Sequence, residues 1–266
     1  MPVRPLFRPD PATFADGHAL AQRLIEWLAH LPPRKAISMK LTYYGQSCIG
    51  VETGDRHLLF DPFISGNPLA KHVDVSKVPA THVLLTHGHG DHVADAESIL
   101  KRTGAELISN FEICEWFGAK GIQRSHPMNI GGKLDLGAFQ VKMVMAQHSS
   151  TLPDGAPGGS AAGFVVFTGE GNFHHAGDTG LMLDMQLLKR HALRFACLPI
   201  GDNYTMGIED AVEAAGYMGV RTVVGLHYNS FPVISINTQG AIRAFEQAGL
   251  RLLLPGIGTS ITIQQA

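Results

Sequence analysis

The sequence predicts one layered α/β domain that follows a short N-terminal extension. Short strand-like runs alternate with helical segments from Met39 onward, a pattern typical of sheets packed against helices. Several of these runs end in histidine or aspartate, so polar groups gather where strands end. The 45% apolar content of the 266 residues is sufficient for a large packed core.

Residues 1–38 are predicted to form the extension, with one amphipathic helix, and residues 39–266 to form the main domain. The helix is indicated by a single apolar stripe, which Pro32 ends. A flank of the same domain is the simplest surface for it to cover, and a partner-binding or membrane-surface helix is the alternative. The stripe is also a candidate interface for a homo-oligomer. The stripe consists of Leu20, Leu24, Trp27, Leu28 and Leu31.

The first half of the main domain is expected to begin with a β-meander and to continue into a histidine-rich loop. Gly45 and the Gly54-Asp55 pair mark its turns. The strands are predicted at 39–44, 48–52, 57–60, 83–86 and 105–109, and the helices at 94–102 and 111–117.

The second half is expected to alternate more regularly between strands and helices. Its loop 152–160 is rich in turn-forming residues and is predicted to border the functional site. The strands are predicted at 141–146, 162–168, 172–176, 195–200, 222–226, 251–254 and 261–263, and the helices at 182–191, 208–218 and 238–247.

The segment His87-Gly88-His89-Gly90-Asp91-His92 directly follows an apolar strand. Imidazole and carboxylate are ligands of divalent transition metals. Alternation along an extended chain places His87 and His89 toward one ion and Asp91 near a second, which His92 joins after the chain turns. The glycines permit tight turns. The alternative is a polar loop of solvated histidines.

Three more candidate ligands, His148, Asp178 and His227, each follow a separate strand-like run. Seven candidates in total match two ions that share one bridging group. Asp178 stands between glycines and is predicted to bridge the ions with its two oxygens.

Other polar residues at strand ends are candidates for supporting roles. Asp61 is expected either to accept a hydrogen bond from a ligand histidine or the metal loop, or simply to form a turn before Pro62. His175 is a candidate support for the ligands. The candidates for stabilising a developing oxyanion, each with a turn-forming role as its alternative, are Asn203, Tyr204 and Asn229.

Composition limits the functional classes. A net charge of −2 offers no basic field for nucleic acid, which makes such a partner disfavoured. The three cysteines are widely separated in apolar contexts, as expected of reduced core residues and not of metal ligands. There is no apolar run of about 18 residues and no signal-peptide pattern, so we expect a soluble, cytoplasmic protein without membrane contact.

The ordered motifs THGHGDH, His148, GDTG and His227 resemble the metallo-β-lactamase superfamily. The chain is most similar to its UPF0173 group of metal-dependent hydrolases, which are relatives of the ascorbate-6-phosphate lactonases. The resemblance covers Met39 to Gly258 and leaves residues 1–38 outside. It rests also on the segments NPLAKHV, ISNFEI, HPMNIGG, QHSS, HAGDTGL, LPIGDNYTMGIEDA and LHYNSFP.

The resemblance implies an αββα sandwich, an α/β fold of four layers, with the metals at one edge. It assigns Asp178 as the bridge and Asp61 as the acid that supports the metal loop. Gln46 departs from the pattern, since relatives typically carry histidine in a G-H-S segment here. The implied ligands are His87, His89 and His148 for one ion and Asp91, His92 and His227 for the other.

We therefore expect a hydrolase that uses two divalent metal ions to activate water against an ester-type bond of a small molecule, most simply a lactone or a phosphodiester. Asp91 is expected to orient the water or accept its proton. Zn²⁺ is the first choice for these nitrogen and oxygen ligands, with Mn²⁺ or Fe²⁺ as alternatives. The alternative functions are an iron-dependent oxidoreductase or dioxygenase on the same fold and a metal-binding module without catalysis.

Overall fold

The computed structural model describes Gln22 and residues 38–264. The predicted apolar stripe between Leu20 and Leu31 lies outside the described residues. The N-terminal extension at 1–38 and the boundary that follows it stay predictions.

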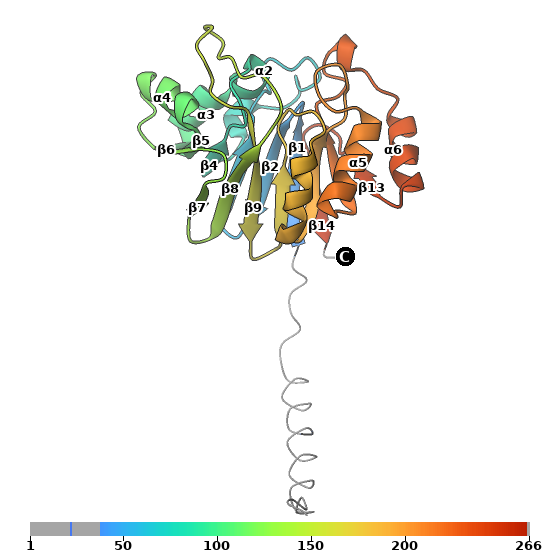
Figure 1. Ribbon diagram of the computed structural model, residues 1–266. Helices are drawn as coiled ribbons and strands as arrows, with labels where there is room; N and C mark the ends of the chain where they lie inside the picture. Colours follow the sequence, from blue (N-terminus) through green and yellow to red (C-terminus); the bar gives the residue numbers. More distant parts are fainter. Residues whose placement is uncertain (1–21, 23–37, 265–266) are drawn as a thin grey trace, which may run out of the picture. The chain divides into compact units, whose positions relative to one another are not determined.

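Two seven-stranded sheets face each other in the centre of the domain (Figure 1). In spatial order the first sheet contains β14 (Thr259–Gln264), β1 (Ser38–Gly45), β2 (Cys48–Thr53), β3 (Arg56–Phe60), β4 (His82–Leu84), β5 (Glu106–Asn110) and β6 (Ser125–Met128). The second contains β13 (Arg251–Leu253), β12 (Thr222–Leu226), β11 (Leu193–Pro199), β10 (Asn172–His175), β9 (Ala162–Thr168), β8 (Phe139–Met145) and β7 (Lys133–Asp135).

Both sheets are mixed in the same way. Strands β14, β1, β2 and β3 pair antiparallel, and β3 to β6 pair parallel. In the second sheet β7 to β10 are antiparallel and β10 to β13 are parallel. The carboxyl ends of β8, β10 and β12 therefore point to one edge of the second sheet, and β4 ends at an edge of the first. Loops that carry chemistry gather at such edges.

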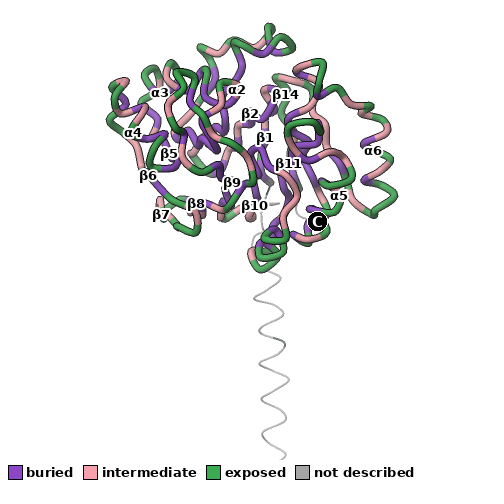
Figure 2. The backbone as a smooth tube through the Cα atoms, turned by 45° about the horizontal axis from the view of Figure 1, so that its top comes forward, coloured by how far each residue is buried: buried purple, intermediate pink, exposed green. Residues whose placement is uncertain are grey.

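The inner core lies between the two sheets and follows from the alternation of side chains along each strand. In β1 the buried residues Met39, Leu41 and Tyr43 alternate with more exposed neighbours. The ring of Phe60 lies 5.9 Å from that of Phe173, so aromatic side chains of both sheets meet at the centre. Figure 2 shows this buried layer running along the strands.

Helices cover the outer faces, which completes the predicted four-layer α/β sandwich. The central parallel strands β4 and β12 are buried almost throughout, as expected of strands covered on both faces. The first sheet is covered by α3 (Ala96–Thr103) and α4 (Phe111–Ala119), and the second by η2 (Leu183–His191), α5 (Ile208–Met218) and α6 (Thr238–Gln247).

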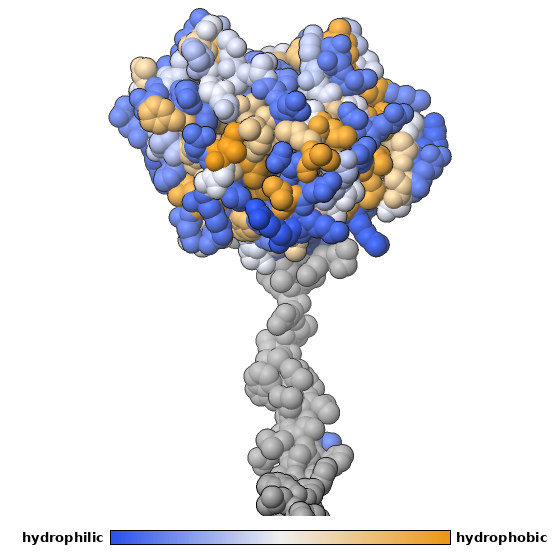
Figure 3. All heavy atoms as spheres, viewed as in Figure 1, coloured by the Kyte–Doolittle hydropathy of each residue, from blue (hydrophilic) through white to orange (hydrophobic). Residues whose placement is uncertain are grey.

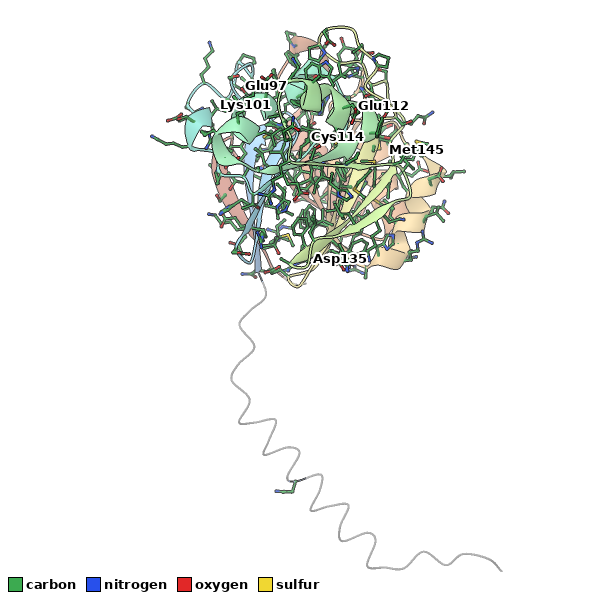
Figure 4. The ribbon with its side chains drawn as sticks, turned by 90° about the vertical axis from the view of Figure 1, so that its left-hand side faces the viewer. Glu97, Lys101, Glu112, Cys114, Asp135 and Met145 are labelled. Carbon is green, nitrogen blue, oxygen red and sulfur yellow. The ribbon has the colours of Figure 1, made fainter. Side chains whose placement is uncertain are left out.

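The surfaces of the covering helices differ in polarity. On the outer face of α3 (Figure 4), Glu97 and Lys101 form an exposed ion pair of 2.6 Å. Near η2, in contrast, apolar side chains gather on the face shown in Figure 3; Met145, Leu183 and Leu187 are each at least half exposed there.

Two strands, three short helices and one helix type differ from the sequence-based expectation. The short helices that were not predicted are η1 (Val75–Lys77), α2 (Gly90–Val93) and η3 (Pro232–Ile234). Strands β6 and β7 were not predicted, because β6 contains Pro127 and β7 has only three residues after Gly131-Gly132. The predicted helix at 182–191 is a 3₁₀ helix, η2. The remaining predicted strands and helices are present with ends shifted by a few residues.

The three cysteines are free and buried, in agreement with their predicted place in the core. Within the described part of the chain, no helix combines the length and apolar character needed to cross a bilayer.

Candidate metal centre

All seven predicted ligands lie together at one edge of the sandwich, in segments that follow β4, β8, β10 and β12. Two of them, Asp91 and His92, lie in the short helix α2 (Gly90–Val93) after β4. Their ligand atoms form two groups, and within each group all of these atoms lie within 4.8 Å of one another. The first group is His87, His89 and His148, and the second is Asp91, His92, Asp178 and His227. Both sheets contribute to both groups.

In the first group, Nε2 of His87 lies 3.0 Å from Nδ1 of His89. The imidazoles of His87 and His148 meet nearly edge to face, with centroids 5.0 Å apart. The other nitrogen of His89, Nε2, lies 3.4 Å from the hydroxyl of Ser149. His87 thus offers Nε2 to a common point, and His89 offers Nδ1.

Asp178 links the two groups. Its Oδ2 lies 2.9 Å from Nε2 of His227 and 3.2 Å from Nε2 of His92. The same oxygen lies 3.7 Å from Nε2 of His148 in the first group. The second oxygen, Oδ1, accepts a hydrogen bond from the Ser47 hydroxyl at 3.4 Å. One oxygen of Asp178 therefore faces both groups, whereas the sequence had suggested that each oxygen would face one ion.

The residues present fit a divalent metal. Ligands about 2.0–2.1 Å from a tetrahedral ion are separated from one another by about 3.3 Å, and the nitrogen–oxygen separations around Asp178 span 2.9–3.7 Å. The buried Nε2 of His92 has no hydrogen-bond partner among the described residues, although Asp178 Oδ2 is close. These atoms converge on a shared point.

Asp61 fixes the orientation of two of the histidines. This fully buried carboxylate accepts hydrogen bonds from the Thr86 backbone amide at 2.8 Å and the Thr86 hydroxyl at 2.6 Å. It also lies 2.9 Å from Nδ1 of His92. Because the Thr86 hydroxyl donates to Asp61, its oxygen is free to accept from Nδ1 of His87 at 3.0 Å. Both imidazoles then carry their proton on Nδ1 and present a lone pair at Nε2.

In the second group, protons and metal cations compete for the same ligand atoms. Burial lowers the pKa of His87 well below its usual value. Burial also disfavours a charged His227, but the carboxylate of Asp178 overrides this and raises its pKa to about 9. The site therefore attracts positive charge, which a metal ion supplies while displacing the proton.

Comparison with known proteins places the chain in a family. The beta-lactamase superfamily domain matches residues 56–228. A UPF0173 metal-dependent hydrolase from Christiangramia forsetii is 46% identical over 227 residues, which are 85% of this chain and 100% of the relative. The chain belongs to the UPF0173 metal-dependent hydrolases. It is accordingly an enzyme, a metal-dependent hydrolase of the metallo-β-lactamase superfamily.

Solved structures agree with this assignment of the UPF0173 hydrolase. Igni18, a metallo hydrolase from Ignicoccus hospitalis, matches with a TM-score of 0.78 and 34% identity over 85% of this chain and 99% of that one. An isothiocyanate hydrolase from Delia radicum gut bacteria matches with a TM-score of 0.68 over 86% of this chain and 100% of that one. At 19% identity, this second likeness shows the fold alone.

His175 of the UPF0173 hydrolase lies behind the ligands. Its Nδ1 accepts from the backbone amide of Gly177 at 3.2 Å, and its Nε2 donates to the carbonyl of Ser47 at 3.0 Å. The ring stacks on Phe60, with centroids 4.8 Å apart. His175 thus anchors the segment that leads to Asp178; its supporting role toward the ligands stays a prediction.

A cavity of about 620 Å³ opens directly over the site. Of the three oxyanion candidates, only Tyr204 lines it. Asn203 and Asn229 adopt left-handed backbone conformations with φ near +60°, and the Asn229 side chain accepts from the amide of Ile236, which agrees with the turn-forming alternative. The cavity is lined by His89, Asp91, His148, Ser149, Asp178, Tyr204, His227, Phe231 and Val233.

The loop 152–160 does not line this cavity, contrary to expectation. Leu152 instead lies against Gly88, where an added Cβ would come within 3.1 Å of the leucine side chain. Ser150, just before the loop, accepts a hydrogen bond from the Gly88 amide at 3.1 Å. The segment therefore supports the histidine-rich loop from behind the cavity.

The sequence did not predict Ser47, which bonds to Asp178, or the cavity residues Ser149, Phe231 and Val233. The contact of Ser47 joins residues 131 positions apart in the chain, and no local pattern marks it. The Gly45 turn between two predicted strands was the available signal, because turns at a sheet edge approach other loops there.

Proposed function

We propose that this enzyme hydrolyses an ester-type bond of a small molecule with a centre of two divalent metal ions. His87, His89 and His148 would hold one ion, and Asp91, His92 and His227 the other. The observation that carries the proposal is the position of Asp178 Oδ2, within 3.7 Å of histidine nitrogens from both groups. A single carboxylate oxygen so placed is suited to bridge two cations.

The cations would lower the pKa of a water molecule toward neutrality and polarise the substrate oxygen. The residues of the chain orient these reactants. Asp91 is partly exposed to the cavity and is positioned to accept the proton of the attacking water. Tyr204 is exposed at the cavity wall, where its hydroxyl is available to donate to a developing oxyanion.

The cavity wall favours a lactone over a phosphodiester. No lysine or arginine is among the described residues that line the cavity, whereas Phe231 and Val233 contribute apolar surface. A phosphate group would have only the metal ions to balance its charge. A neutral ring ester would bury its carbon skeleton against Phe231 and Val233 and direct its carbonyl toward the ligands.

Zn²⁺ is the proposed metal, because a set of imidazoles and carboxylates without thiolate suits it. Mn²⁺ and Fe²⁺ use the same ligands. Metal analysis of the purified protein decides among them. A protein that contains iron and consumes oxygen during turnover would contradict the hydrolytic proposal.

The test combines metal analysis with a hydrolysis screen of lactones, cyclic and linear phosphodiesters, and thioesters. We expect about two ions per chain and the highest kcat/KM for a lactone. The variants H87A and D178A should lose bound metal and hydrolysis together. H72A, which changes an exposed histidine outside the site, is the control and should retain both.

Two outcomes would overturn the proposal. Full hydrolysis in either ligand variant would exclude a metal centre at this place. Inactivity toward every substrate class, with two ions bound per chain, would favour a metal-binding protein without catalysis.

A further inference from the structure

The turn between β1 and β2 lies against the second group of candidate ligands. Its central residue, Gln46, is fully buried and has a left-handed backbone with φ of +52°. A glutamine in this conformation is uncommon, and such residues persist only where surrounding contacts hold them. The contacts of Gln46 therefore indicate which residues the turn holds in position.

The side chain of Gln46 bonds to a candidate ligand. Its Nε2 lies 2.8 Å from Oδ2 of Asp91. Because an ionised carboxylate only accepts hydrogen bonds, the amide nitrogen and not the amide oxygen must face it. Asp91 Oδ2 is also the oxygen that lies 3.6 Å from Nε2 of both His92 and His227. Gln46 thus holds the oxygen of Asp91 that faces these histidines.

The backbone of Gln46 bonds to a second candidate ligand. The amide of His227, whose φ is +53°, donates to the Gln46 carbonyl at 3.0 Å. The Tyr43 hydroxyl donates to the same carbonyl at 3.2 Å. One residue therefore touches Asp91 from the loop after β4 and His227 from the loop after β12, which belong to different sheets. Gln46 makes no such bond to the first group in the described structure.

The amide oxygen of Gln46 indicates that packing alone does not explain a glutamine here. Oε1 of Gln46 is buried and has no hydrogen-bond partner among the described residues. An unpaired buried acceptor is unfavourable, so packing alone would favour an apolar side chain at this position. The N–H bond to Asp91 is the contact that an apolar side chain could not make.

We propose that Gln46 is a positioning residue that sets the affinity of the second group for its cation. It acts by fixing Asp91 Oδ2 and the backbone of His227 relative to each other. This inference rests on the proposed two-metal function. It assigns to Gln46 a role that acts on one ion and leaves the other unchanged.

The test replaces Gln46 with methionine, which has similar length and no donor. Q46M should weaken binding of Zn²⁺ at one of the two sites, the second group, by roughly 10–100-fold, the range for groups that orient metal ligands. The affinity of the other site should stay as in the unchanged protein. Chelator competition measures both affinities, and the absorption of Co²⁺ added in place of Zn²⁺ reports the geometry of each site.

Asn67 supplies the matched control. It is a buried amide whose Oδ1 accepts from the backbone amide of Leu69 at 3.0 Å, and among the described residues its side chain has no hydrogen bond to either group. N67L should lower stability without changing either metal affinity. An equal loss of second-ion affinity in N67L and Q46M would show that Gln46 matters only for folding, and would overturn the proposal.

A measurement on the unchanged protein covers the case in which Q46M does not fold. With selective ¹⁵N labelling of glutamine, one side-chain amide should shift during addition of one of the two equivalents of Zn²⁺ and stay constant during addition of the other. The absence of such a signal would contradict the proposal. Binding of only one ion by the unchanged protein would instead contradict the two-metal function itself.

Discussion

Asp61 combines several local functions in one carboxylate. It receives the Thr86 amide and hydroxyl and faces Nδ1 of His92, so it sets the tautomer of His92 directly and that of His87 through Thr86. We predict that D61N, which introduces N–H groups where acceptors are needed, lowers metal affinity by roughly 10–100-fold. Chelator competition with Zn²⁺ measures the change.

Asp95 is the control for Asp61. It is also a buried carboxylate, and it accepts hydrogen bonds from the amides of Ile64 and Ser65 and from the Ser65 hydroxyl. D95N should destabilise the fold while metal affinity stays unchanged. Loss of metal affinity in D95N to the same extent would show that general destabilisation explains both results.

A second prediction at the residue scale concerns acid stability. Burial lowers the pKa of His174 from 6.5 to about 4, and its Nδ1 donates to the Phe164 carbonyl. Between these values the unfolded chain binds a proton that the folded protein excludes. Stability is therefore complete above pH 6.5 and falls as the pH drops toward 4, by up to about 3 kcal/mol.

Urea unfolding of the metal-free protein at pH 7 and pH 5 tests this effect. H174Q removes the titrating group, so its free energy of unfolding should change less between the two pH values than that of the unchanged protein. Equal changes would assign the acid sensitivity to other groups.

A site position could be predicted from the sequence where neighbouring residues in the chain already indicate its role. His87, His89, Asp91 and His92 share one loop, and their types and spacing indicate metal binding. From its own neighbours in the chain, Asp61 was predicted as one of two alternatives, since its bond to His92 spans 31 positions; the supporting role came from the family resemblance. The bond of Gln46 to Asp91 spans 45 positions, and nothing near Gln46 in the chain indicates it.

At the scale of elements, close backbone approach explains where glycine is required. A Cβ on Gly201, directly after β11, would overlap the carbonyl oxygen of His227. We predict that G201A displaces the loop that carries His227 and lowers both stability and the content of bound metal. Calorimetry and metal analysis measure the two effects.

Gly216 is the matched control on the next element. It lies within α5, and a Cβ there would meet nothing within 4 Å. G216A should therefore stabilise the protein by about 0.5–1 kcal/mol, because alanine favours a helix over glycine. Metal content should stay unchanged. A gain of stability in G201A as well would contradict the proposed overlap.

The elements themselves were predictable where periodicity was strong. The buried apolar runs of β9, β11 and β12 appear in the sequence. Strands β6 and β7 could not be recognised in the sequence, because a run of three or four residues with proline or glycine nearby shows no clear alternation of apolar and polar side chains. Their place at the ends of the two sheets comes from pairing with β5 and β8, which is a tertiary interaction.

At the scale of the whole molecule, bound metal should stabilise the fold, because each ion is proposed to join loops from both sheets. An ion present at 100 times its dissociation constant contributes about 2.7 kcal/mol. For a domain of this size, that corresponds to a rise in Tm of roughly 5–10 °C per ion. Calorimetry with Zn²⁺ and with a chelator tests this prediction, and D178A should show little difference between the two conditions.

Other expectations for the whole molecule stay predictions. The possible homo-oligomer was based on the stripe from Leu20 to Leu31, which lies outside the described residues. The expected cytoplasmic location and the disfavoured nucleic-acid partner are likewise untested by the fold. The four-layer architecture itself could be predicted, because the resemblance covered most of the chain.

The distribution of candidate ligands along the chain has a consequence for biosynthesis. Each group combines residues from the loop after β4 with residues that follow strands of the second sheet. A growing chain that has reached only β9 possesses His87, His89 and His148 but lacks Asp178 and His227. The proposed two-ion arrangement would therefore assemble only after β12 has emerged and both sheets have packed. On this proposal, the growing chain gains hydrolytic activity only when folding is nearly complete.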